Sequence, residues 1–139
     1  MTTETLQAET AAFPLNLQVI RDSAGWLTHQ CYGQALHMGW HTDLNTGEPK
    51  PVSVPEKLML IVSELGEAME GHRKKLKDDK LPQFDMVAVE LADAAIRVFD
   101  TAGLLGYDLG EIIALKLEFN AKRADHQLAA RRAEGGKAY

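Results

Sequence analysis

The chain has little cysteine and no long apolar run, and each shortage excludes a class of protein. Its single cysteine, Cys31, cannot form an internal disulfide, and no Cys/His pair has zinc-finger spacing. No apolar run approaches the roughly 20 residues that a membrane-spanning helix needs, and residues 1–12 are polar rather than signal-like. We therefore expect a cytoplasmic protein that has no membrane partner.

An excess of positive charge is also missing, which argues against a nucleic-acid partner. The 15 Lys/Arg and 20 Asp/Glu give a formal net charge of -5, the wrong sign for attraction to a phosphate backbone. The charge is uneven, because residues 1–115 carry 9 basic and 17 acidic side chains whereas residues 116–139 carry 6 and 3. An acidic body with a basic end suits a metal ion beside a phosphate, although a solvated helix end gives the same pattern.

Strand signals are absent, and helical periodicity predicts an all-α, four-helix protomer. The 139 residues, 45% of them hydrophobic, suffice for one domain. We expect a flexible arm over residues 1–12, a single all-α domain over 13–130 and a mobile basic tail over 131–139. Gly103 and Gly106 are expected to end the third helix. The predicted helices run over residues 14–39, 53–77, 84–102 and 108–128, with a loop at 40–54.

Two of the predicted helices carry carboxylates one turn apart. The second helix contains Glu64-x-x-Glu67 and the third contains Glu90-x-x-Asp93, so each helix presents two acids to one ion. Side by side, the helices would bring four carboxylates together, and repulsion would raise their pKa values unless cations compensate it. Oxygen ligands favour Mg²⁺ or Mn²⁺, and two divalent ions would balance four negative charges.

These acidic pairs also have ordinary explanations. A Glu-x-x-Glu pair on a helix is most often a solvated face. Glu90 and Asp93, however, interrupt a window, residues 84–99, that holds 12 apolar residues and only four charges, where unpaired charges are seldom tolerated. Arg97 and Asp100 continue the same helical stripe. An ion pair between Arg97 and Asp93 would therefore supply a purely structural account.

A third polar group follows in the fourth predicted helix. Lys116, Asn120 and Arg123 recur at four and three residues along a single face. Ammonium, amide and guanidinium donors on one strip suit phosphate oxygens, and arginine offers bidentate contact. Surface cations near a helix C-terminus, which stabilise the helix dipole, are the commoner case for such residues. Phosphate donors beside metal-binding carboxylates would indicate phosphoryl chemistry.

As a combination, these motifs resemble those of the MazG-like, all-α nucleoside triphosphate pyrophosphohydrolases. The resemblance covers residues 15–126 and implies a helical protomer that forms a dimer or tetramer. It also implies hydrolysis of a nucleoside triphosphate to the monophosphate and pyrophosphate, in bacteria or their phages. The motifs that carry it are Glu64-x-x-Glu67, Glu90-x-x-Asp93 and Lys116-x-x-x-Asn120-x-x-Arg123.

The resemblance assigns roles to these residues. It implies two or more Mg²⁺ or Mn²⁺ ions per site, which would polarise the phosphates and activate a water molecule. Glu67, with Glu64 as the second candidate, is expected to take the proton from that water. The implied metal ligands are Glu64, Glu67, Glu90 and Asp93, and the implied phosphate contacts are Lys116, Asn120 and Arg123.

The nucleobase would need an apolar or aromatic slot. Trp40 and Trp26 are candidates for stacking on the base, and His37 and Asn16 are candidates for contacts to its edge, although a core or surface role is the more common explanation for each. The resemblance to phage-type members of the family favours purine deoxynucleotides such as dGTP or dATP as substrates, although the residues themselves do not specify the base. The base preference and the role of the loop over residues 40–54 stay open at this point.

Two alternative functions survive and two fail. A di-iron helical protein needs Glu-x-x-His and an HD-type phosphohydrolase needs adjacent His-Asp, and the sequence contains neither motif. A phosphoribosyl-ATP pyrophosphohydrolase-like enzyme would share the motifs and differ in its substrate. A non-catalytic helical module with an acidic stripe would bind a basic partner and would need no metal.

Overall fold

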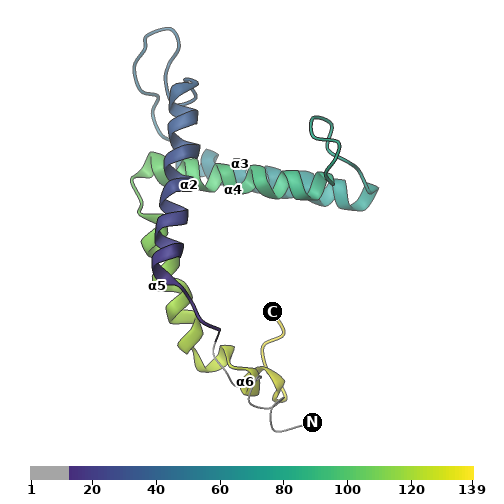
Figure 1. The fold of residues 1–139 in the computed structure, drawn as a ribbon. Helices are drawn as coiled ribbons and strands as arrows, with labels where there is room; N and C mark the ends of the chain where they lie inside the picture. Colours follow the sequence, from purple (N-terminus) through teal and green to yellow (C-terminus); the bar gives the residue numbers. More distant parts are fainter. Residues whose placement is uncertain (1–12) are drawn as a thin grey trace. The chain divides into compact units, whose positions relative to one another are not determined.

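The computed structural model describes residues 13–139, which form helices and loops and contain no β-strand. The prediction of an all-α fold is therefore confirmed, and residues 1–12, the predicted arm, lie outside the described residues. None of the described helices is both long and apolar enough to cross a membrane. The helices are α2 (Leu17–His37), α3 (Val54–Lys74), α4 (Met86–Leu105), α5 (Leu109–Lys122), the 3₁₀ turn η1 (Ala124–His126) and α6 (Leu128–Arg132) (Figure 1).

The chain divides into two compact units. The larger unit is Ala24–Leu109, which contains α3, α4 and most of α2. Among the described residues, the smaller unit joins residues 13–23 to Gly110–Tyr139 and contains η1, α6 and nearly all of α5. The domain limits predicted from the sequence, and the mobility expected for residues 131–139, stay predictions.

Helices α3 and α4 form an antiparallel hairpin in the larger unit, where they lie side by side along their length (Figure 1). The start of α3 is capped by Ser53, whose hydroxyl oxygen accepts a hydrogen bond from the backbone N–H of Glu56 at 3.4 Å. Lys75 ends α3 in the left-handed conformation. Lys77 and Asp85 then pair at 2.6 Å across the connecting loop, which returns the chain into α4.

The two glycines predicted to end the third helix have different roles. Gly106 ends α4, because it adopts a φ of 72° that residues with a side chain rarely adopt. Gly103 lies inside α4, so the prediction that it helps to end the helix is wrong. A Cβ at Gly103 would lie 2.4 Å from the Cβ of Tyr32, so its missing side chain lets α2 approach α4 closely.

The fourth predicted helix is shorter than expected. We predicted a helix to about residue 128, but α5 ends at Lys122. Arg123 adopts an extended backbone, and the side-chain amide of Gln127 donates hydrogen bonds to the carbonyls of Ala121 and Arg123 at 2.9 and 3.0 Å. These bonds satisfy carbonyl groups at the helix end, which replaces the bonds that a further helical turn would make.

Small residues form the buried part of the larger unit. Ala24, Ala68, Ala94 and Ala102 are buried, and no large side chain among residues 13–139 is fully buried. One side of α3 leaves four large apolar residues exposed at helical spacing, and we call this set the α3 apolar stripe. The stripe consists of Leu58, Val62, Leu65 and Met69.

The contact between Gly103 and Tyr32 predicts an effect on stability. Gly103→Ala should lower the free energy of unfolding by about 1–3 kcal/mol, because the added methyl group must displace the tyrosine or the helix. Gly66→Ala is the matched control on α3, where a Cβ meets nothing within 4 Å, and it should raise stability by up to about 1 kcal/mol. Urea denaturation measures both changes, and equal effects of the two variants would contradict the packing.

Candidate metal centre

Three carboxylates from the hairpin converge on one point in the larger unit. Glu64 comes from α3 and Glu90 and Asp93 come from α4, and one oxygen from each lies within 4.8 Å of the others. Glu64 and Glu90 are only 8% and 6% exposed, whereas Asp93 is half-buried. The three-residue spacing on α4 turns both of its acids toward α3. This carboxylate cluster can hold a metal ion.

Glu90 is the least compensated member of the cluster. Its Oε2 is buried and has no hydrogen-bond partner among the described residues. Burial, together with the neighbouring Glu64 and Glu67, raises the pKa of Glu90 to about 7. Near neutral pH this carboxyl group therefore needs either a proton or a cation, and a metal ion at the cluster would supply the cation.

Glu67 lies beside the carboxylate cluster rather than within it. It is one turn beyond Glu64 on α3 and is exposed, and it is not among the three residues whose oxygens converge. Its negative charge nevertheless contributes to the raised pKa of Glu90. An exposed carboxylate next to the carboxylate cluster is well placed to exchange protons with solvent.

Arg97 compensates one of the three carboxylates. The structural alternative paired it with Asp93, but its Nε donates to Oε1 of Glu64. The pKa of Asp93 is raised by burial and by the charge of Glu64, and the positive charges of Arg97 and Lys80 oppose this only in part. The arginine therefore does not neutralise the cluster, and the need for a further cation persists.

The carboxylate cluster opens into a cavity of about 800 Å³ within the larger unit. Glu64 and Asp93 line this cavity, and Lys50 and Lys57 contribute positive charge to its wall. The end of α2, the loop over residues 40–54, α3 and α4 all contribute to the lining. The cavity therefore joins the carboxylate cluster to a mixed apolar and basic surface.

The buried His41 and the half-buried Asp100 form a polar pair that also lines the cavity. His41 is 7% exposed, and its Nε2 lies 2.7 Å from Oδ1 of Asp100 on α4. The ring of Tyr32 lies against the imidazole, with 5.7 Å between ring centroids. Sequence reasoning missed His41, Lys50 and Lys57. Asp100 belongs to a helical stripe that the sequence shows, whereas no periodic signal marks His41 or the two lysines.

The four residues proposed for base contact have different surroundings. Trp40 lines the cavity, whereas Trp26, His37 and Asn16 are not among its lining residues. Trp26 is exposed and makes an edge contact with the ring of His29. Asn16 accepts a hydrogen bond from the backbone N–H of Val19 at 3.1 Å, as a helix-capping residue does.

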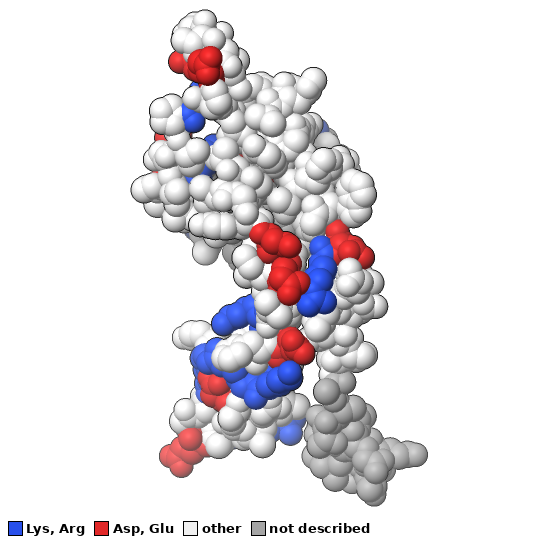
Figure 2. Space-filling view, turned by 90° about the vertical axis from the view of Figure 1, so that its left-hand side faces the viewer, with Lys and Arg blue, Asp and Glu red and all other residues white. Residues whose placement is uncertain are grey.

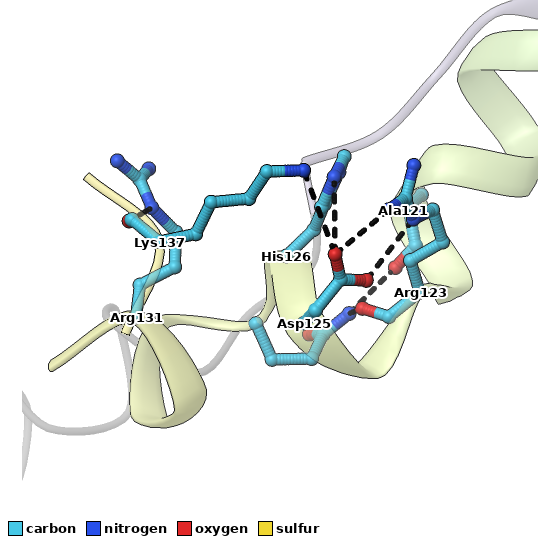
Figure 3. Close-up of polar contacts among 7 residues, drawn as sticks. Ala121, Arg123, Asp125, His126, Arg131 and Lys137 are labelled. Atoms are coloured by element: carbon cyan, nitrogen blue, oxygen red, sulfur yellow. Dashed lines mark hydrogen bonds and ion pairs between the residues drawn. The ribbon is translucent and has the colours of Figure 1, made fainter. Parts of the chain in front are cut away.

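The predicted phosphate strip belongs to the smaller unit, where basic and acidic side chains mix over α5, η1 and α6 (Figure 2). Lys116 lies over the ring of Phe119, with 5.0 Å between Nζ and the ring centroid. Oδ1 of Asn120 is buried without a hydrogen-bond partner among the described residues. Arg123 forms a bidentate ion pair with Asp125 at 3.0 and 2.7 Å (Figure 3).

No protein-family model, curated protein or solved structure matches the chain. The resemblance to MazG-like enzymes therefore rests on the identity and spacing of the residues in the three motifs. The carboxylate cluster is an independent structural observation, since it depends on how α3 and α4 pack.

The raised pKa of Glu90 predicts a pH-dependent stability when EDTA removes metal. The folded protein holds the proton up to about pH 7, whereas the unfolded chain releases it near pH 4.5. Stability should therefore fall by about 3 kcal/mol as the pH rises from about 4.5 to about 7, at roughly 1.4 kcal/mol for each pH unit. Urea denaturation across this range measures the loss.

Glu90→Gln should remove this loss and be more stable than the wild type at pH 8. The matched control is Glu70→Gln on α3, whose carboxylate forms exposed ion pairs with Arg73 and Lys74. Its pH profile between 4.5 and 7 should follow the wild type. A Glu90→Gln profile that also falls with the wild type would show that Glu90 is not the buried acid responsible.

Proposed function

We propose that this protein is a metal-dependent nucleoside triphosphate pyrophosphohydrolase, which converts a nucleoside triphosphate to the monophosphate and pyrophosphate and so controls or cleanses a nucleotide pool. The observation that carries the proposal is the buried, unpartnered Oε2 of Glu90 within a cluster of three carboxylates. An acidic stripe that served only to bind a basic partner would be exposed, and two of these acids are buried. The cluster therefore favours a metal centre over the interaction module.

The donor set suits hard divalent cations. All three proposed ligands are carboxylates, and no cysteine or histidine of residues 13–139 belongs to the cluster. Such ligands favour Mg²⁺ or Mn²⁺ over zinc or copper. We propose two or more ions per site, because Glu67 adds a fourth negative charge beside the cluster. Glu64, Glu90 and Asp93 would be direct ligands in this arrangement.

The residues of the site would divide the catalytic work. Bound Mg²⁺ or Mn²⁺ supplies a water molecule of lowered pKa and neutralises charge on the phosphates. Glu67, which is exposed beside the cluster, would accept the proton of the attacking water. Glu64 is the second candidate for this role, but its ion pair with Arg97 reduces its availability as a base.

Basic side chains would bind the phosphates. Lys57 on α3 lines the cavity that contains Glu64 and Asp93, so it is a candidate from the larger unit itself. Lys50 also lines the cavity, but its Nζ donates a hydrogen bond to the carbonyl of Trp40 at 3.4 Å. We also retain the strip of Lys116, Asn120 and Arg123 as proposed phosphate contacts. The bidentate pair with Asp125 means that a phosphate would have to replace a carboxylate on Arg123.

The apolar part of the cavity supports the proposed substrate class. Trp40 lines it and provides an aromatic surface for a nucleobase. The preference for a purine deoxynucleotide such as dGTP or dATP is part of the proposal. A phosphoribosyl-ATP pyrophosphohydrolase-like activity remains the alternative enzyme reading, and a substrate panel distinguishes the two.

We propose that the protein forms a homo-oligomer, either a dimer or a tetramer. The α3 apolar stripe leaves large side chains in water, and burying them against a second copy would be favourable by about 25 cal/mol per Å². A second copy is the simplest partner, because a symmetric contact places the same apolar surface on both sides.

The proposed activity predicts pyrophosphate release from nucleoside triphosphates in Mg²⁺ or Mn²⁺ and its loss in EDTA. Glu90→Gln and Asp93→Asn should stay folded and lower kcat/KM by roughly a hundredfold or more, because each removes a metal ligand. Glu70→Gln, an exposed carboxylate on the same hairpin, should keep the wild-type rate within about twofold. A pyrophosphate assay over a panel of triphosphates measures the rates. Parental rates in both cluster variants would reject the metal centre.

The proposed assembly predicts a mass in solution of at least twice the 15.3 kDa of one chain. Val62→Lys, in the α3 apolar stripe, should shift the protein toward the monomer, because it would bury a charge at the interface. Val19→Lys on α2 is the control, since the two valines are similarly exposed in the single chain, at 51% and 55%. Light scattering after gel filtration separates the outcomes, and a monomeric wild-type protein would contradict the assembly.

A further inference from the structure

We infer that His41 and Asp100 form a specificity-determining pair that binds the nucleoside part of the substrate, at the end of the cavity away from the carboxylate cluster. This inference rests on the proposed function, because it assumes that the phosphates lie against the cluster. It adds a role for the loop over residues 40–54, which the motifs of the sequence leave unassigned.

The direction of the cavity along α4 supports this placement. The residues of α4 that line the cavity run from Asp93 toward the C-terminal end as far as Leu104. Asp93 and Asp100 are two helical turns apart, so they share one face and are separated by roughly 10 Å along the helix axis. A triphosphate whose phosphates are held by cations beside Asp93 would therefore carry its nucleoside toward Asp100, because the α4 residues that line the cavity continue only in that direction.

The surface around the pair suits a nucleoside rather than a further phosphate. Trp40 precedes His41 in the chain and lines the same cavity, and Ile96 and Leu104 add apolar surface from α4. The carboxylate of Asp100 would repel a phosphate group, whereas its bond to the imidazole is compatible with a neutral ligand. An aromatic wall next to a fixed polar group is the usual composition of a site for a planar, hydrogen-bonding ligand.

The imidazole is held in a defined orientation. The 2.7 Å contact with Oδ1 of Asp100 engages Nε2, and Tyr32 packs against the ring. Nδ1 is then the ring nitrogen available to a ligand. The backbone carbonyl of His41 also accepts a hydrogen bond from the N–H of Lys50 at 2.9 Å, which closes the loop at its base. A hydrogen-bonding group on the base or sugar would contact this imidazole.

The alternative is that the pair only anchors the loop, and a substrate without a nucleoside separates the two roles. His41→Gln and Asp100→Asn should raise the KM for the triphosphate that the wild-type protein hydrolyses fastest by about tenfold. The inhibition constant of inorganic tripolyphosphate, measured as a competitor in the same assay, should change by less than about twofold. His29→Gln, the same substitution at an exposed position of α2, should leave both constants unchanged.

Three outcomes distinguish the nucleoside role of His41 and Asp100 from the proposed hydrolase activity itself. An equal rise in both constants, or no change in KM, would overturn the nucleoside role while leaving the hydrolase proposal intact. Failure of the wild-type protein to hydrolyse any triphosphate in Mg²⁺ or Mn²⁺ would instead reject the proposed function. Thermal denaturation of each variant shows whether it is folded.

A measurement on the wild-type protein covers the case in which the variants do not fold. In protein labelled with ¹⁵N-histidine, the ring signals of His41 should shift when a nucleoside monophosphate is added with Mg²⁺. Pyrophosphate with Mg²⁺ should leave them in place. Unchanged ring signals with a saturating monophosphate would contradict contact between the imidazole and the nucleoside.

Discussion

A buried carboxylate oxygen that has no hydrogen-bond partner requires a proton or a cation nearby, and Oε2 of Glu90 places this requirement at the centre of the α3–α4 hairpin. Glu64 and Asp93 lie beside it, so the charge problem is shared by three acids. Arg97 forms an ion pair with Glu64 and so compensates its negative charge. It does not compensate the charges of Glu90 and Asp93 to the same extent. The packing of α3 on α4 thus creates a site whose stability in water at neutral pH depends on an added positive charge.

The same helix that creates this requirement also organises the cavity. α4 carries Asp93, a member of the carboxylate cluster, and Asp100 two turns further on. One helical face therefore connects the candidate metal centre with the buried His41. Gly103 lets Tyr32 approach that face, which supports the imidazole from α2. In the proposed function, the helical repeat of α4 therefore places a phosphate-binding end and a nucleoside-binding end of the cavity on one face of the same helix.

The all-α fold and the acids of the cluster were predictable because both depend on short-range spacing. A three-residue interval places Glu90 and Asp93 on one helical face in any α-helix, and their apolar neighbours predicted that this face is buried. The contact of His41 with Asp100 was not predictable, since it joins residues 59 positions apart and a loop has no period. The early end of α5 depends on the side chain of Gln127, which competes locally with continued helix.

Direct titration of Mn²⁺ into the protein at neutral pH, followed by calorimetry in two buffers of different ionisation enthalpy, tests the central claim. We expect saturable binding that releases protons, because Mn²⁺ would replace the proton on Glu90, whose pKa is about 7. Glu90→Gln should bind at least about tenfold more weakly and release fewer protons. Equal affinity and equal proton release in Glu90→Gln and the wild type would contradict the claim.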